Sequence, residues 1–140
     1  MGNVHKTEIL IVGSGMVGSS LAIALSGAGF KVVLVDQVKP AVQLGSEFDG
    51  RASAIAATPQ KMLCQIGIWQ HLKKNFMPIK DIRVADGGSR LFLHYKHEDV
   101  LYEALGFMVE NRHFRHACIA KIIKDKNILF LAPSTIDKIS

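Results

Sequence analysis

Short apolar runs flank a segment with helical spacing in the first part of the chain. Residues 7–12 (TEILIV) and 31–36 (KVVLVD) are β-rich, which is typical of strands buried on both faces of a parallel sheet. The apolar positions with helical spacing in residues 16–26 are Val17, Leu21, Ala24 and Leu25. Strand, helix and strand in this order predict a βαβ unit with a right-handed crossover.

The pattern changes after this unit. Residues 37–57 have the composition of a loop, and a helix is predicted from Thr58, with Pro59 at its first position, to near Gly67. The remaining predicted elements are a β-hairpin at 82–86 and 91–95, a strand at 107–109, a helix at 111–124 and a strand at 128–131. Only about three strands have a parallel pattern. We therefore predict an α/β fold with a Rossmann-like βαβ core, an inserted β-hairpin and an incomplete three-layer domain.

Composition limits the class of protein. The chain has 140 residues, 49% of them apolar, which suits one folded domain and excludes intrinsic disorder. Residues 9–30 carry no charge, but their glycines and serines divide the run, so we expect a soluble protein, and the scarcity of cysteines predicts the reducing cytoplasm as its compartment. Two distant cysteines, Cys64 and Cys118, predict neither a zinc cluster nor a disulfide framework. The net charge of +5 is compatible with phosphates or an anionic membrane surface as partners.

A glycine motif carries the clearest chemistry. Gly13-Ser14-Gly15-Met16-Val17-Gly18 is a G-x-G-x-x-G between a predicted strand and a predicted helix. Gly13 permits a tight turn, Gly15 lets a pyrophosphate approach the backbone, and Gly18 allows the helix to pack closely on the strand. Asp36, at the end of the second strand, is placed to accept hydrogen bonds from a ribose hydroxyl and to repel a 2′-phosphate. The motif predicts a dinucleotide site and leaves FAD and NAD open.

Arg51 is a second candidate for this site. It lies in the small-residue run Asp49-Gly50-Arg51-Ala52-Ser53-Ala54-Ile55-Ala56, and its guanidinium matches phosphate oxygens in a bidentate manner. An ordinary surface arginine explains the pattern equally well.

Two longer segments resemble a known family. DGRASAIA at 49–56 and EALGFMVENRHFRHA at 103–117 closely resemble the polyprenyl-phenol hydroxylases of ubiquinone biosynthesis. These are class A flavoprotein aromatic monooxygenases of the para-hydroxybenzoate hydroxylase type, and the resemblance runs from Thr7 to the chain end. It implies that FAD binds at Gly13, Ser14, Gly15, Gly18 and Asp36, with Arg51 near the pyrophosphate and flavin. It further implies that Asn111 lies against the cofactor, although a helix N-cap would also explain that residue.

The resemblance also implies an activity. In the intact family NAD(P)H reduces FAD, and dioxygen then serves to hydroxylate a polyprenyl phenol, so no residue here is expected to act as acid, base or nucleophile. Such a fold requires about two to three times this length. We therefore expect residues 1–140 to be the N-terminal part of an FAD-binding domain. The later flavin- and substrate-binding parts are expected to be absent and the chain to be inactive alone, with peripheral association at the inner membrane face as a further implication.

Two other functions remain open. The chain could be an NAD-binding module of another oxidoreductase, or a non-catalytic fragment that completes a flavoprotein with a separately encoded C-terminal half. A metal site is not expected, because the histidine pairs 94/97 and 113/116 lack matching cysteine or carboxylate partners. Nucleic acid is not expected either, because no aromatic residues suited to base stacking are interleaved in the basic region. The basic residues of that region, interpreted as a solvated helix face, are Arg112, Arg115, Lys121, Lys124 and Lys126.

Overall fold

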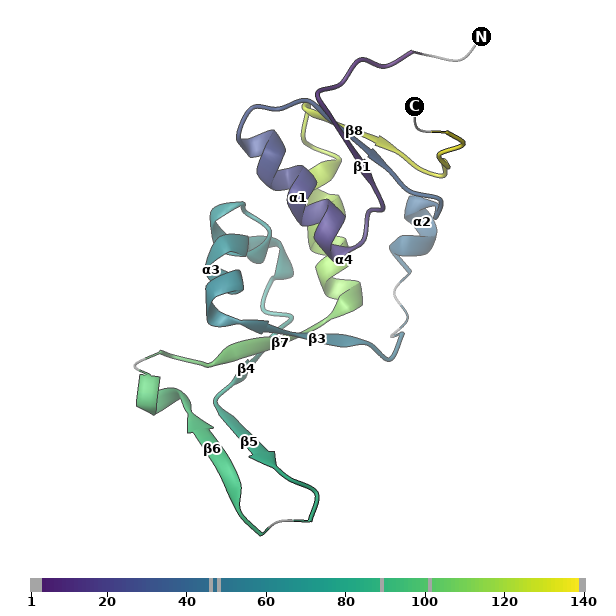
Figure 1. Ribbon diagram of the computed structural model, residues 1–140. Coiled ribbons are helices and arrows are strands. Elements are labelled where there is room, and N and C mark those ends of the chain that lie inside the picture. Colours follow the sequence, from purple (N-terminus) through teal and green to yellow (C-terminus); the bar gives the residue numbers. More distant parts are fainter. Residues whose placement is uncertain (1–3, 46, 48, 89, 101, 139–140) are drawn as a thin grey trace.

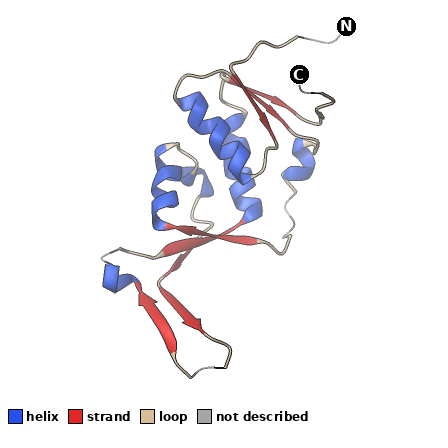
Figure 2. Ribbon diagram, viewed as in Figure 1, coloured by secondary structure: helices blue, strands red, loops and turns tan. Residues whose placement is uncertain are grey.

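The computed structural model describes all residues except 1–3, 46, 48, 89, 101 and 139–140. Helices lie between a parallel sheet and an antiparallel sheet, and a hairpin extends away from them (Figures 1 and 2). This arrangement confirms the predicted α/β class with a parallel βαβ core and an inserted hairpin.

The parallel sheet has three strands in the order β1-β2-β8, with bounds Ile9–Val12, Val32–Val35 and Ile128–Leu131. Its central strand β2 is buried along its whole length, as predicted. One face of the sheet packs against the core, whereas Leu10, Val12 and Leu129 are exposed on the other. The prediction that the first strand is buried on both faces is therefore wrong, because no described segment covers that face of β1.

Helix α1 (Met16–Gly27) packs across this sheet, and α4 (Asn111–Ile122) packs on α1. Two of the apolar positions noted in the sequence lie outside the buried face, since Val17 is 81% and Leu21 48% exposed, whereas Leu25 is partly buried against the core. The buried residues of α1 are Ser19, Ala22, Ile23 and Ser26. Small side chains on this face let the helix approach its neighbours closely. Both buried serine hydroxyls donate hydrogen bonds, to the Ser14 carbonyl and to Asp125.

The antiparallel sheet corrects the prediction of a loop over residues 37–57. Within that range lie a one-turn helix, α2 (Pro40–Gln43), and a strand, β3 (Ala52–Ala56). The sheet has the order β3-β7-β4, in which β7 is Gly106–Glu110 and β4 is Met77–Ile79. The ASAIA sequence of β3 has little strand preference of its own, and its conformation depends on pairing with β7, where Ala52 is opposite Glu110.

Helix α3 (Ala57–Gln65) follows β3 directly, so Pro59 is its third residue and not its first. A short 3₁₀ helix, η1 (Trp69–Leu72), comes next and packs on α4. Trp69 contacts Phe76 and Phe107, with ring centroids 4.9 and 5.1 Å apart. These aromatic contacts join the helices to the antiparallel sheet.

The predicted hairpin is formed by β5 (Asp81–Ala85) and β6 (Phe92–Lys96), and η2 (His97–Val100) follows it. Its register pairs Ile82 with Tyr95. In Figure 1 the hairpin projects from the far side of the antiparallel sheet. Among the described residues, no helix is both long and apolar enough to cross a membrane.

Candidate functional site

The turn between β1 and α1 has the geometry expected from its glycines. Gly13 has a φ of +101°, in the left-handed region that glycine favours, and its N–H donates to the Val35 carbonyl at 2.7 Å. A Cβ on Gly18 would overlap the Gly13 carbonyl and lie 3.4 Å from the Ile11 side chain. Gly13 therefore serves the turn, and Gly18 serves the contact of helix and strand.

Gly15 differs from both. It is the N-cap of α1 with a φ of −62°, which any residue can adopt, and a Cβ placed there would meet no described atom within 4 Å. Helix α1 has no acidic residue in its first turn and no side chain capping its free N–H groups. Protein packing therefore does not require glycine at this position. The open space and the partial positive charge of the helix N-terminus suit an anionic group that approaches the backbone.

A hydrogen-bond network links the turn to the end of β2. Asp36 Oδ2 accepts from both the N–H and the hydroxyl of Ser14, each at 2.7 Å, and Oδ1 accepts from the Val38 N–H at 2.8 Å. Since the Ser14 hydroxyl donates to Asp36, it accepts from Gln43 Nε2, which lies 2.9 Å away. Gln43 Nε2 also donates to the Val38 carbonyl. The carboxylate is thus held in place and keeps one free lone-pair direction on Oδ1.

The pKa of Asp36 is lowered from the ordinary value of an aspartate. Burial alone would raise this pKa, because a partly buried charge is less well solvated. The hydrogen bonds from the Ser14 N–H, the Val38 N–H and the Ser14 hydroxyl stabilise the carboxylate and outweigh burial. The group is therefore ionised at neutral pH and able to accept a hydrogen bond from a ligand.

This shift predicts a pH dependence of stability. Because the pKa of Asp36 is lower in the folded than in the unfolded chain, its contribution is present above the unfolded value of about 3.9 and is lost as the pH falls through the folded value. We expect Asp36→Asn to show a smaller loss of unfolding free energy on acidification than the unaltered chain. Urea unfolding between about pH 3 and pH 7 measures this. Asp86→Asn in the exposed hairpin is the control, and identical pH profiles for the Asp36 variant and the unaltered chain would contradict the expectation.

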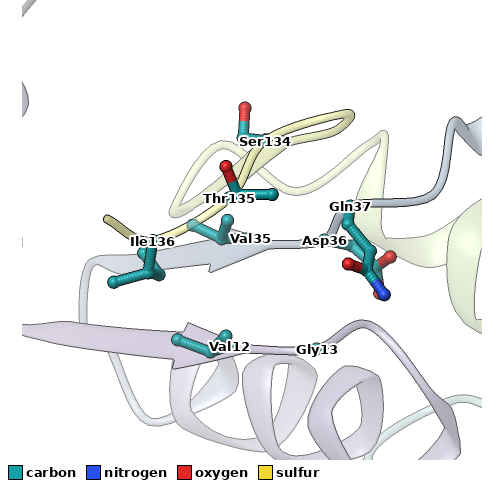
Figure 3. A pocket seen from close by; sticks show the side chains of 8 residues that line it. All are labelled: Val12, Gly13, Val35, Asp36, Gln37, Ser134, Thr135 and Ile136. Atoms are coloured by element: carbon teal, nitrogen blue, oxygen red, sulfur yellow. The ribbon is translucent and has the colours of Figure 1, made fainter. Parts of the chain in front are cut away.

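A cavity of about 420 Å³ lies at the carboxyl ends of β1 and β2. Its lining residues are Val12, Gly13, Val35, Asp36, Gln37, Ser134, Thr135 and Ile136 (Figure 3). The segment after β8 is tied across the end of β2, because the Ser134 N–H donates to the Asp36 carbonyl at 2.8 Å. Ser134 and Thr135 were not predicted, since nothing in the local sequence pattern indicates that the segment after the last strand returns to the glycine turn.

A second cavity, of about 340 Å³, lies at the N-terminus of α1. It is lined by Ser14, Gly15, Met16, Asp36, Val38, Gln43, Arg51, Asn111 and Arg115. Five of the seven predicted site residues therefore meet here. Gly13 lines only the first cavity, and Gly18 lies behind the turn and lines neither. Asp36 lines both cavities, so the two are adjacent parts of one elongated site.

Arg51 and Asn111 are brought together by the antiparallel sheet. The Asn111 N–H donates to the Arg51 carbonyl at 3.0 Å, and Asn111 Oδ1 accepts from the Ser53 hydroxyl at 2.7 Å. The Arg51 side chain is 68% exposed and pairs with Asp49 at 2.8 Å. The alternative of Asn111 as helix N-cap is wrong, because Glu110 occupies the cap and Asn111 is the first residue of α4.

Arg115 corrects a further expectation. The sequence analysis placed it on a solvated helix face, but its side chain is only 20% exposed and lines the second cavity. Gln43 was also missed, since it lies in the range interpreted as a loop. The only sequence signal for Arg115 is its position one helical turn after Asn111, which places both residues on the same face of α4.

The arrangement suits binding of an elongated anionic ligand. The first cavity lies beside the fixed carboxylate of Asp36. The second has open space at the N-terminus of α1, which a Cβ at Gly15 would occupy, and is also lined by two arginines. These features fit the sugar and the diphosphate of a dinucleotide. Within the described part of the chain, no three histidine, cysteine or acidic residues are grouped as metal ligands would be. Cys118 is buried, and desolvation raises the pKa of its thiol to about 12, which makes it an unreactive thiol of the core.

Comparison with known sequences gives several matches. A profile of the family described as FAD binding domain matches residues 6–111. Ubiquinone hydroxylase UbiL of Rhodospirillum rubrum is 44% identical over 127 residues, 91% of this chain and 29% of that protein. The 3-demethoxyubiquinol 3-hydroxylase of Escherichia coli is 32% identical over 109 residues, 76% of this chain and 28% of its own length. These matches confirm the resemblance carried by residues 49–56 and 103–117. The chain spans less than a third of the length of these relatives.

Solved structures share the fold. The p-nitrophenol 4-monooxygenase PnpA from Pseudomonas putida superposes with a TM-score of 0.67 at 19% identity, over 87% of this chain and 30% of that one. PqsL of Pseudomonas aeruginosa, in complex with 2-aminobenzoylacetate, superposes with a TM-score of 0.65 at 19% identity, over 89% of this chain and 33% of its own. At this level of identity the likeness concerns the fold.

Proposed function

Because the chain belongs to the FAD binding domain family, we propose that its elongated site binds the ADP half of FAD and that residues 1–140 are the N-terminal part of an FAD-binding domain. The observation that carries this proposal is the open space around Gly15 at the N-terminus of α1, where a Cβ would meet no described atom within 4 Å. Its missing Cβ serves no packing purpose in the described chain, and Arg51 lines the same cavity. A diphosphate uses both features at once.

In this proposal the adenosine occupies the cavity at the ends of β1 and β2. Asp36 Oδ1 has one lone-pair direction left after its bond from Val38, and a ribose hydroxyl can donate to it. The negative charge of Asp36 disfavours a 2′-phosphate at the same place. The adenine then lies beside Gln37 and Thr135, which line the cavity.

The diphosphate lies at Ser14 and Gly15, with the N–H groups of the first turn of α1 directed at it. Arg51 supplies a guanidinium from the loop that leads into β3. Asn111 lies further along the site, towards the flavin. In this proposal Asn111 binds the cofactor through its amide N–H groups, while its Oδ1 accepts from the Ser53 hydroxyl. Gly13 shapes the turn and lines the adenosine cavity, whereas Gly18 lies behind the turn and lines neither cavity.

For the longer protein that this chain represents, we propose an NAD(P)H- and O₂-dependent hydroxylase acting on a polyprenyl phenol. Support comes from the relatives, whose names describe ubiquinone hydroxylases. When bound, FAD supplies the redox chemistry, and the described residues bind and orient it. Residues 1–140 alone are proposed to bind cofactor without turnover. We also propose peripheral association with the membrane, with which the net charge of +5 is compatible.

Titration of the 140-residue chain with FAD, and separately with NAD, tests the proposal. We expect saturable quenching of flavin fluorescence and a higher unfolding temperature with FAD, because a ligand that binds only the folded state stabilises it. Arg51→Ala should raise the Kd for FAD by about tenfold, since a charge-assisted contact to phosphate is lost. A folded chain that binds NAD and not FAD would overturn the proposal in favour of an NAD-binding module.

A further inference from the structure

Two arginines in the second cavity share one carboxylate. Asp49 Oδ2 accepts from Arg51 Nη2 at 2.8 Å and from Arg115 Nη2 at 3.1 Å. Asp49 also accepts from the Arg51 N–H through Oδ1, so it fixes both the backbone and the side chain of that residue. Asp49 itself is not part of the cavity lining, whereas both arginines are. A carboxylate outside the cavity lining therefore holds two guanidinium groups that line it.

The two arginines differ in how firmly they are held. Arg115 is 20% exposed, comes from helix α4, and has a second anchor because its Nε donates to the Gln43 carbonyl at 3.3 Å. Arg51 is 68% exposed and comes from a loop. Gln43 also holds the Ser14 hydroxyl, so the anchor of Arg115 is joined to the glycine turn. Arg115 is thus the more buried cation of the site, anchored by two elements, and Arg51 is the more exposed one, held by Asp49.

The charges at the border do not cancel. Two guanidinium groups face one carboxylate, and the N-terminus of α1 adds a partial positive charge. Hydrogen bonds from Arg51 and Arg115 outweigh desolvation and lower the pKa of Asp49 to about 2, so the carboxylate stays ionised at any working pH. Two guanidinium groups and the helix N-terminus therefore leave a local positive excess at the Asp49 border of the cavity, part of which the ionised Asp36 of the same cavity offsets.

From this geometry, and resting on the proposed function, we propose that Arg115 is a second guanidinium contact for the diphosphate of FAD, and that Asp49 is a positioning residue that orients Arg115 and Arg51 together. The alternative is that Arg115 only links α4 to the loop before β3 and does not contact the ligand. The two roles differ in which part of the ligand they affect: a diphosphate contact acts on the phosphates, whereas a structural link acts on every part of the site.

The test is a set of binding titrations on the 140-residue chain with FAD, and competition against FAD by ADP and by adenosine. We expect Arg115→Gln to raise the Kd values for FAD and ADP by about tenfold and to change that for adenosine by less than about twofold. Arg115→Lys keeps the charge but loses the two-point anchoring, so an increase of about threefold for FAD is expected. Arg83→Gln in the remote hairpin removes the same charge and should leave all three Kd values unchanged.

Asp49→Asn gives an independent test, because a pure charge effect and a positioning role of Asp49 predict opposite changes in the Kd for FAD. Removing a negative charge beside an anionic ligand would by charge alone tighten binding. If Asp49 orients the arginines, binding of FAD and ADP is weakened instead, by about threefold or more. Circular dichroism at the titration temperature shows whether each variant is folded, and Arg115→Lys decides the question if Arg115→Gln does not fold.

Each outcome has a defined meaning. Kd values for Arg115→Gln that match those of Arg83→Gln, or equal losses for ADP and adenosine, would overturn the role of Arg115. Tighter binding by Asp49→Asn would overturn the positioning role of Asp49. Absence of FAD binding in the folded, unaltered chain would instead refute the proposed function itself, which separates the two failures.

Discussion

Gly15→Ala is expected to weaken FAD binding by at least about a hundredfold, or about 3 kcal/mol, while leaving the chain folded. The reason is that the Cβ of alanine would meet no described protein atom within 4 Å and would occupy the place where a diphosphate must approach the helix N-terminus. The φ of −62° suits alanine, so the free energy of unfolding should change by no more than about 1 kcal/mol, the usual range for a substitution at a helix N-cap. Flavin fluorescence titration and thermal unfolding measure the two effects separately.

The matched control is Gly27→Ala in the same helix. Gly27 also has nothing within 4 Å of a built Cβ, but it lies at the opposite end of α1 from the proposed diphosphate site. The Gly27→Ala variant should bind FAD with the same Kd as the unaltered chain. If Gly15→Ala also bound FAD within about twofold of the unaltered chain, the diphosphate would not lie where we propose.

Gly18→Ala is expected to have the opposite profile, with loss of stability as its primary effect. A Cβ at Gly18 would overlap the Gly13 carbonyl, and a backbone atom in a tight turn cannot move aside as the end of a side chain can. Helix α1 must then shift away from β1, at a cost of about 3 kcal/mol, the upper part of the usual range for overpacking. For a domain of this size the unfolding temperature should fall by about 10 °C.

Thermal and urea unfolding of Gly18→Ala, with Gly27→Ala again as control, measure this cost. The control should be neutral or slightly stabilising, because alanine favours helix over glycine by about 1 kcal/mol. An unchanged unfolding temperature for Gly18→Ala would contradict the close contact between helix and strand. The two substitutions together separate the roles of the motif, since Gly15 affects the ligand and Gly18 affects the fold.

The sequence predicted elements whose signals are local. Three such elements occur where expected: the buried strand β2, the glycine turn and the hairpin. Each is marked by a pattern within a few residues. Strand β3 was missed because ASAIA has no strong preference, and pairing with β7 decides its conformation. The buried face of α1 was also missed. It carries serines and alanine, which a search for large apolar residues does not identify.

The candidate site divides in the same way. Ser14, Gly15 and Asp36 were predicted because the glycine motif and the end of the second strand are adjacent in any βαβ unit. Arg51 was a candidate from its small-residue run, with an ordinary surface arginine equally possible, and only the resemblance to a family favoured it, whereas Asn111 came from that resemblance alone. Gln43, Asp49 and Arg115 were not identified as parts of the site, because a glutamine, an aspartate and an arginine in these positions look like ordinary surface residues.

The sequence by itself therefore determined the βαβ unit, the dinucleotide motif and, through the resemblance, the flavoprotein family. These depend on side chains that act at their own position or within one turn or strand. Only the tertiary structure decided which cations face the site. The bonds of Asn111 to Ser53 and of Arg115 to Asp49 join residues 58 and 66 positions apart. Such pairs meet because β3 pairs with β7 and α4 packs on α1, and long-range packing of this kind leaves no trace in local spacing.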